Sequence, residues 1–229
     1  MRTVGVDLSA HARGTGIATI DWPDGGGRPQ VTGVQVGADD KAVLAAIRGA
    51  DRVAIDCPLG WPDPFVDLLV SHRVGRAPAP VGHSGIEWRR TLSRRATDLH
   101  VAATVPGAVP LAVAADRIAA VAMRCAGLQA ALADAGRPVD RAGSGLLVEV
   151  YPAAALRVWG LTSRSFKGPG NRPALSALVD ELRAALPALA SGVKFSRARR
   201  GWCRGCAWSS RPWPPPRGRT AGPPAGLRF

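Results

Sequence analysis

Three short apolar segments, each with one acidic residue, constrain the fold of this chain more than any other feature. Asp7 ends the run VGV, Asp56 ends the run VAI, and Glu149 lies between Val148 and Val150. Runs of this kind suit strands that are buried on both faces. An unpaired carboxylate there costs several kcal/mol. We therefore expect each of the three carboxylates to be hydrogen-bonded, ion-paired or metal-bound.

The periodicity of the rest of the chain predicts an α/β fold with a mixed sheet. An opening β-hairpin and a third strand precede a helix capped by Asp39 or Asp40, and each later strand follows a helical segment. Pro152 and Pro173 each suit the start of a helix. The predicted strands are 4–9, 15–22, 31–37, 52–56 and 145–152. The predicted helices are 39–50, 64–71, 86–104, 116–136 (capped by Asp116 and closed by Gly136), 152–161 and 173–186.

The acidic residues can meet if the first, fourth and fifth strands are neighbours, because ligands of open α/β sheets bind at the carboxyl ends of strands. Clustered carboxylate oxygens suit Mg²⁺ or Mn²⁺. Two such ions roughly 3.5–4 Å apart can activate a water and stabilise the leaving oxygen of a phosphodiester. The alternative for Asp7 and Asp56 is that each is only a turn or cap residue at a strand end.

Several longer motifs resemble a known family. VGVDLSA with GTGIA, VAIDCPLGWPDPF, RRATD, AADRIAAVAMR and VEVYPAAALRVWGL with FKG are similar to the predicted RNase H-fold nucleases of domain of unknown function 429, over roughly residues 3–187. The resemblance implies an RNase H-like three-layer fold with a five-stranded mixed sheet in the order 3-2-1-4-5. It also implies metal-binding, catalytic carboxylates at Asp7, Asp56 and Glu149. The activity of that family is itself inferred from its fold.

Four further residues are candidates for substrate binding. Arg95, Thr97 and Asp98 of RRATD would form a polar cluster on one helix that could face the carboxylates and hold an anionic substrate. The alternative is an Arg–Asp pair at i, i+3 spacing on a solvated surface. Lys167, in FKG, could contact a phosphate or could be an ordinary loop residue.

The charge is unevenly distributed. The net charge is +13, but nine basic residues and no acidic ones lie between Lys194 and Arg228, whereas the other 21 basic residues face all 17 acidic ones. We therefore divide the chain into a domain over 1–191 and an irregular basic tail over 192–229. The tail could be a nucleic-acid-binding arm, a disordered extension, or the product of a frameshift in a G+C-rich gene that replaced an acidic C-terminal helix.

Other classes of protein fit less well. The four cysteines are too few for a disulfide framework, WCRGC lacks the strand and helix that a redox motif needs, and the four histidines lack zinc-ligand spacing. No segment has the apolar length needed to cross a bilayer, and none resembles a signal peptide. We expect a cytoplasmic protein.

The sequence thus predicts a metal-dependent nuclease or phosphodiesterase that uses Mg²⁺ or Mn²⁺ and has nucleic acid as its partner. One alternative is a non-catalytic module of the same fold that binds nucleic acid or nucleotides. Another is an actin-like phosphotransferase, which needs a phosphate-binding loop directly after Asp7 and a second domain. Leu8-Ser9-Ala10-His11 follows Asp7 instead, and the chain is short for two domains.

Overall fold

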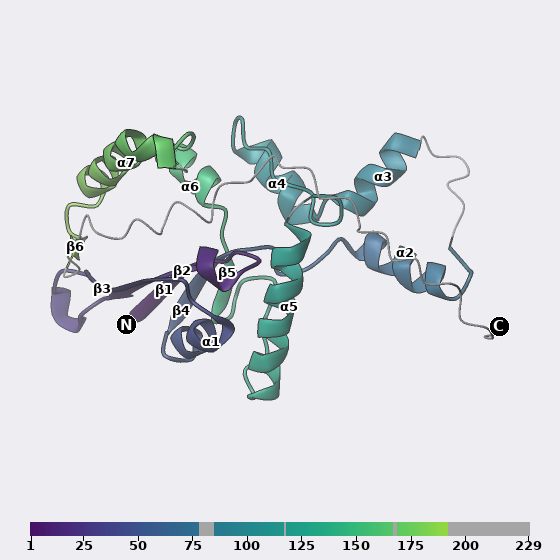
Figure 1. Ribbon diagram of the computed structural model, residues 1–229, viewed down its shortest axis with the longest axis horizontal. Helices are drawn as coiled ribbons and strands as arrows, with labels where there is room; N and C mark the ends of the chain where they lie inside the picture. The colour runs from purple at the N-terminus through teal and green to yellow at the C-terminus, as the bar shows by residue number, and fades with distance from the viewer. Residues whose placement is uncertain (78–84, 117, 167–168, 192–229) are drawn as a thin grey trace, which may run out of the picture.

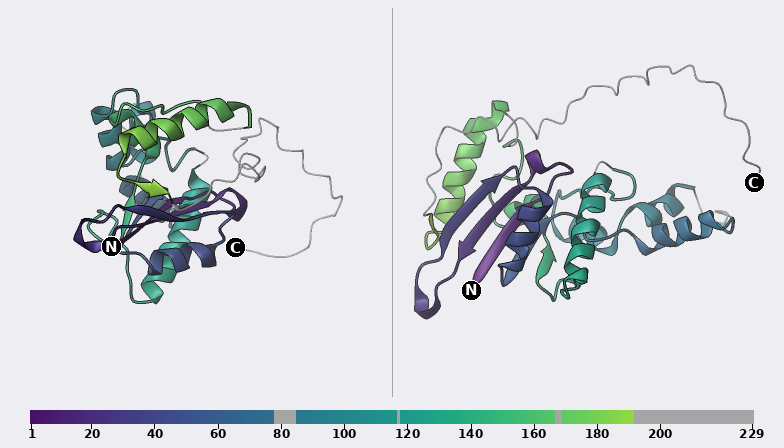
Figure 2. Two further views of the ribbon diagram at one scale, coloured as in Figure 1. Left: turned by 90° about the vertical axis from the view of Figure 1, so that its left-hand side faces the viewer. Right: turned by 60° about the horizontal axis from the view of Figure 1, so that its bottom comes forward.

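A computed structural model describes residues 1–77, 85–116, 118–166 and 169–191. These residues form a mixed six-stranded sheet in the order β5-β4-β1-β2-β3-β6, with helices on both faces (Figures 1 and 2). The strands are β1 Arg2–Asp7, β2 Gly16–Asp21, β3 Gln30–Val36, β4 Arg52–Asp56, β5 Leu147–Glu149 and β6 Ala190–Ser191. The helices are α1 Asp40–Arg48, α2 Asp63–Arg73, α3 Gly85–Ser93, α4 Ala96–Thr104, α5 Ala119–Asp134, α6 Pro152–Val158 and α7 Arg172–Ala185.

The first five strands have the predicted topology. β1, β2 and β3 form an antiparallel meander, and β4 and β5 then add in parallel beside β1. This arrangement confirms an open mixed sheet with the order 3-2-1-4-5 flanked by helices. The sixth strand, β6, was not predicted; it pairs with the start of β3 in parallel. Its two residues are too few to show a strand period.

The main hydrophobic core lies between the sheet and helices α1 and α5, whereas α7 lies on the other side of the sheet (Figure 2, left). Alternate residues of the central strands point into this core, as the pleat requires. Helix α5 contributes one buried stripe at helical spacing. The buried residues of β1, β4, α1 and α5 are Val4, Val6, Val53, Ile55, Val43, Ile47, Ala122, Cys125, Leu128 and Leu132.

Of the two predicted helix caps, the one at α1 is confirmed and the one at α5 is wrong. The side chain of Asp39 accepts a hydrogen bond from the amide of Ala42 at 2.8 Å, so Asp39 is the N-cap of α1. Asp116, in contrast, does not cap α5, which begins at Ala119. Its carboxylate accepts from the amide of Ala112 at 2.7 Å and closes the turn before the helix. The prediction for Asp116 was wrong because a local side-chain turn competes with capping.

The single helix predicted over 86–104 is two helices. Helix α3 ends at Ser93, and α4 begins at Ala96. Arg95 lies between them with an extended backbone, φ −81° and ψ 162°. Its side chain and amide both bind Asp98, three residues further on, so a local capping contact accompanies the break. The guanidinium also binds Glu149, a tertiary contact that the helical period does not report.

Helices α2 and α3 project from the body beyond α5 (Figure 1; Figure 2, right). Neither helix contains a buried residue. Among the described residues, no helix combines the length and the apolar character that a membrane crossing requires. Lys167 and the predicted tail over 192–229 lie outside the described residues.

Replacing Asp39 by Ala removes the N-cap of α1 and should lower the free energy of unfolding by about 1 kcal/mol. Asp39→Asn keeps a side-chain oxygen for the Ala42 amide and serves as the matched control. Urea denaturation of both variants measures the difference. Equal destabilisation by Ala and Asn would contradict the capping role.

Candidate active site

Asp7 and Asp56 are the last residues of β1 and β4, and they are paired with each other in the parallel register of the two strands. Residues opposite one another in a ladder point to the same face of the sheet, with the strands about 4.8 Å apart. The preceding residues, Val6 and Ile55, are 3% and 0% exposed, whereas Asp7 is exposed and Asp56 half-buried. The structure therefore brings these two carboxylates together at the carboxyl ends of the central strands.

The surroundings of Asp7 leave room for a ligand. On the β2 side, Asp7 is paired with Gly16, which has no side chain. A Cβ built at Gly16 would lie 4.0 Å from the Cβ of Asp7. The neighbouring strand thus places no side-chain bulk beside this carboxylate.

The loop after Asp7 is held by hydrogen bonds from an arginine that was not among the predicted site residues. Arg124 of α5 donates from Nη1 to the carbonyl of Ser9 and to Oγ1 of Thr15, both at 2.6 Å, and from Nε to Asp40 at 2.6 Å. Thr15 is fully buried. The signal was present in the sequence, because Arg124 is a charged residue within the apolar helix AAVAMRCAGLQAALAD.

Glu149 is not grouped with the two aspartates. It is paired in register with Ile55, one residue before Asp56, and the pleat therefore directs it to the opposite face. Arg95 donates to both carboxylate oxygens of Glu149 at 2.7 Å, and the amide of Leu59 donates to Oε2 at 3.0 Å. Within the described residues, no group of three or more His, Cys, Asp or Glu side chains could hold a metal ion. Of the three carboxylates that were expected to converge, Asp7 and Asp56 lie together and Glu149 lies apart from them.

Arg95 and Asp98 form the other half of this network. Arg95 donates to the carboxylate of Asp98 from Nη2 at 2.7 Å and from Nε at 3.2 Å, and its backbone amide adds a third hydrogen bond at 2.9 Å. The side chains are 12% and 5% exposed, so the alternative of a solvated surface pair was wrong. Thr97 is exposed on the first turn of α4. Contact of these residues with a substrate stays a prediction.

The pKa of Arg95 follows from these contacts. Burial acts to lower it, but hydrogen bonds and charge from Glu149 and Asp98 raise the pKa of Arg95 above its ordinary value. The guanidinium therefore keeps its charge. Because the planar guanidinium donates hydrogen bonds to two carboxylates, Arg95 links the start of α4 firmly to β5.

Cys57, directly after Asp56, is not suited to nucleophilic chemistry. It is 3% exposed and lies against Cys125 of α5, which is fully buried. A hydrogen bond with Cys125, burial, and the charges of Glu149 and Asp56 all raise the pKa of the Cys57 thiol. The thiolate, which is the reactive form, is disfavoured there.

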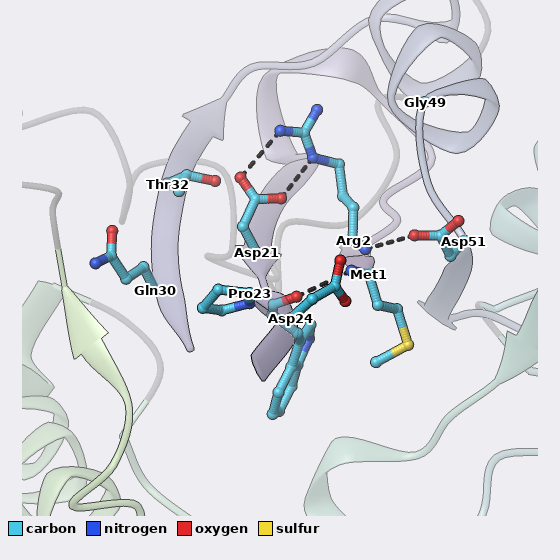
Figure 3. A pocket seen from close by; sticks show the side chains of 10 residues that line it. Met1, Arg2, Asp21, Pro23, Asp24, Gln30, Thr32, Gly49 and Asp51 are labelled. Carbon is cyan, nitrogen blue, oxygen red and sulfur yellow. Dashed lines mark hydrogen bonds and ion pairs between the residues drawn. The ribbon is translucent and has the colours of Figure 1, made fainter. Parts of the chain in front are cut away.

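A depression of about 560 Å³ lies at the opposite end of the central strands (Figure 3). Arg2 donates to Asp21 from Nε at 2.7 Å and from Nη2 at 2.9 Å, and its amide is bound by Asp51. The hydrogen bond from Arg2 lowers the pKa of Asp21. None of the predicted site residues lines this depression, and its one arginine, Arg2, is engaged by Asp21 and Asp51.

The model of a family described as a protein of unknown function (DUF429) matches residues 5–201. No curated protein and no solved structure matches the chain.

Replacing Arg95 by Met should lower the free energy of unfolding by about 3 kcal/mol, because it leaves the buried Asp98 and the half-buried Glu149 without their cation. Arg95→Lys should be intermediate, since it keeps the charge but loses the fork. Chemical denaturation at neutral pH measures both variants.

The matched control is Arg183→Met, which removes an exposed pair with Asp180 at the same i, i+3 spacing in the reverse direction. It should cost less than about 0.5 kcal/mol. Equal effects at positions 95 and 183 would show that the Arg95 network contributes no more than a surface ion pair.

Proposed function

Because the chain belongs to the DUF429 family, whose description assigns no function, we propose from its own residues that it is a metal-dependent hydrolase of nucleic-acid phosphodiester bonds. The observation that carries the proposal is the pairing of Asp7 with Asp56 at the carboxyl ends of adjacent parallel strands. That edge is where open α/β sheets bind ligands. An RNase H-like assignment of the fold is part of this proposal and is supported by the strand order 3-2-1-4-5.

The donor set fits Mg²⁺ or Mn²⁺. Asp7 and Asp56 supply hard carboxylate oxygens, and no soft or imidazole ligand is paired with them in the strand register. Mg²⁺ in phosphoryl-transfer sites is commonly held by one or two carboxylates, with water and substrate phosphate completing its shell. A bound ion would lower the pKa of a coordinated water and neutralise charge on the phosphate.

In this proposal Glu149 is a positioning residue. Its carboxylate binds the amide of Leu59 and so anchors the turn that follows Asp56. Arg95 holds the other side of Glu149 and ties it to α4. The two contacts fix the backbone that leaves β4 and thereby the direction of the Asp56 side chain.

The substrate would approach from the open side of Asp7. Gly16 leaves that side without a neighbouring side chain, and Arg124 holds the loop that borders it. Thr97 is exposed on α4, near Arg95, and its hydroxyl is available to a phosphate oxygen. Lys167 keeps its proposed role as a phosphate contact, which rests on sequence alone.

A second candidate is a non-catalytic module that binds nucleic acid or nucleotides. The engagement of Glu149 by Arg95 favours it, because this ion pair takes Glu149 out of the predicted site of three carboxylates. The two candidates differ in a single measurable property, which is turnover.

The decisive assay incubates the full chain with single-stranded and double-stranded DNA, RNA, RNA–DNA hybrid and branched substrates, each with Mg²⁺, Mn²⁺ or EDTA. We expect cleavage that EDTA abolishes. Asp7→Asn and Asp56→Asn, which remove the carboxylate charge at constant shape, should each lower the rate at least about a hundredfold.

Asp24→Asn, an exposed substitution at the opposite end of the sheet, is the control for a contaminating nuclease and should leave the rate unchanged. Mn²⁺ binding, followed by electron paramagnetic resonance, should be lost in the Asp7 and Asp56 variants and retained in Glu149→Gln. Cleavage that persists in both aspartate variants would exclude the proposed site. Nucleic-acid binding without cleavage would select the non-catalytic module.

A further inference from the structure

Two arginines border one glycine in the loop that follows α4. Arg164 donates from Nη2 to the carbonyl of Gly107 at 3.2 Å. A Cβ built at Gly107 would lie 3.7 Å from that nitrogen and 3.4 Å from Nη1 of Arg157. Gly107 is exposed and has a φ of +70°, a conformation that favours glycine, so both guanidinium groups lie close to its backbone. Two positive charges therefore meet at one point of the surface.

No acidic side chain neutralises these two charges. All 17 acidic side chains lie within the described residues, and none of them forms an ion pair with Arg157 or Arg164. Glu181 binds the nearby Thr162, whose amide and hydroxyl each donate to one of its carboxylate oxygens at 2.7 Å. Like charges held close together repel each other, and an anion between them removes that repulsion.

Hydrogen bonds hold the two guanidinium groups without using all of their donors. Arg157 is half-buried and donates from Nε to Oγ of Ser163 at 3.3 Å. Within the described residues, its Nη1 and Nη2 groups have no hydrogen-bond acceptor. Arg164 is exposed and uses Nη2 for the Gly107 carbonyl. Because both side chains are already placed, a ligand that binds them loses less conformational entropy than one that must order them.

The arginine pair belongs to the segment that leaves the sheet at the edge of the candidate active site. Helix α6, which carries Arg157, begins at Pro152, directly beyond the carboxyl end of β5. Strand β5 is parallel to β4, which ends at Asp56. Both strands therefore deliver the chain to the same edge, and a ligand that extends from Asp56 along this edge approaches α6.

We propose that Arg157 and Arg164 bind a phosphate group in front of Gly107, as a backbone contact for a nucleic-acid strand outside the carboxylate pair. A guanidinium presents a planar fork of N–H donors that matches two phosphate oxygens. Such a contact positions a strand and reads no base sequence. The inference rests on the proposed function only for the choice of nucleic acid as the source of the phosphate, because inorganic phosphate has the same chemistry.

An exposed tryptophan favours a nucleic-acid strand over free phosphate. Trp159 directly follows the end of α6, two residues after Arg157, and is 56% exposed. Bases of single strands stack on aromatic side chains, whereas inorganic phosphate has no base. Arginine and tryptophan at the same end of α6 thus match the two parts of a nucleotide.

Binding measurements in EDTA test this inference without cleavage. Fluorescence anisotropy of a labelled single-stranded oligonucleotide, titrated with the full chain at several salt concentrations, gives the affinity and its salt dependence. Arg157→Gln and Arg164→Gln should each weaken binding about tenfold, whatever the base sequence, because a charge-assisted hydrogen bond is lost. Each should also lower the slope of log affinity against log salt concentration by about 0.7. Arg164→Lys, which keeps the charge but loses the fork, should be intermediate.

Arg48→Gln is the matched control. Arg48 is exposed at the end of α1, which leads to the amino end of β4 and so to the opposite edge of the sheet. Its loss should change the affinity less than about twofold, because salt screens a distant exposed charge. Circular dichroism and the melting temperature verify that all variants are folded.

Inorganic phosphate, followed by phosphorus NMR, is the second probe. Its binding should be lost in both arginine variants and unchanged in Trp159→Ala. The tryptophan variant should weaken binding of the oligonucleotide alone, by about fivefold, since only the strand has bases to stack. Unchanged oligonucleotide affinity in Trp159→Ala would refute the stacking role.

A wild-type chain that binds neither probe would overturn the proposal. So would arginine variants that bind both probes as well as Arg48→Gln does. Binding of inorganic phosphate but not of the oligonucleotide, lost with the arginines, would support the site and identify free phosphate as its ligand. Arginine-dependent binding without metal-dependent cleavage would support this site and refute only the proposed hydrolysis. Cleavage with unaffected arginine variants would do the reverse.

Discussion

The arrangement of the candidate site depends on the guanidinium of Arg95, which holds neighbouring segments together. It lies between helices α3 and α4, where the backbone is extended, and it binds Asp98 of α4 and Glu149 of β5 at the same time. Glu149 in turn binds the amide of Leu59, in the turn after β4. One cation therefore links three segments that are far apart in the sequence. The guanidinium stays charged although burial opposes the charged form, because two carboxylates bind it.

This network separates two roles that acidic residues at strand ends can have. Asp7 and Asp56 lie side by side in register and stay accessible from the carboxyl edge of the sheet. Glu149 is shifted by one residue, and that shift turns its side chain to the other face, where it serves as an internal anchor. A carboxylate near a core needs a partner, and within this one sheet Glu149 meets that requirement differently from Asp7 and Asp56.

The sequence allowed much of the fold to be predicted, because period and polarity carry that information. The five main strands and the Asp39 cap follow from local patterns, whereas the order of the strands was implied by the family resemblance. The grouping of Glu149 with the aspartates could not be predicted correctly, because the strand register decides it and a shift of one residue reverses the face. The break at Arg95 was also missed, since helical periodicity continues across it, while the side chain of Arg95 binds Asp98 and also Glu149, which lies 54 residues away.

The contact between Arg124 and the loop after Asp7 has a consequence for the order in which the molecule assembles. Ser9 and its partner Arg124 are separated by 115 residues, whereas the strands β1 and β2 on either side of the loop pair locally. The hairpin can form early, because it closes a short loop, but its connecting segment gains its final hydrogen bonds only when α5 docks. During synthesis the two strands of the hairpin can therefore pair before the loop between them gains its native hydrogen bonds. The surface beside Asp7 therefore acquires its native hydrogen bonds only after α5 has been made.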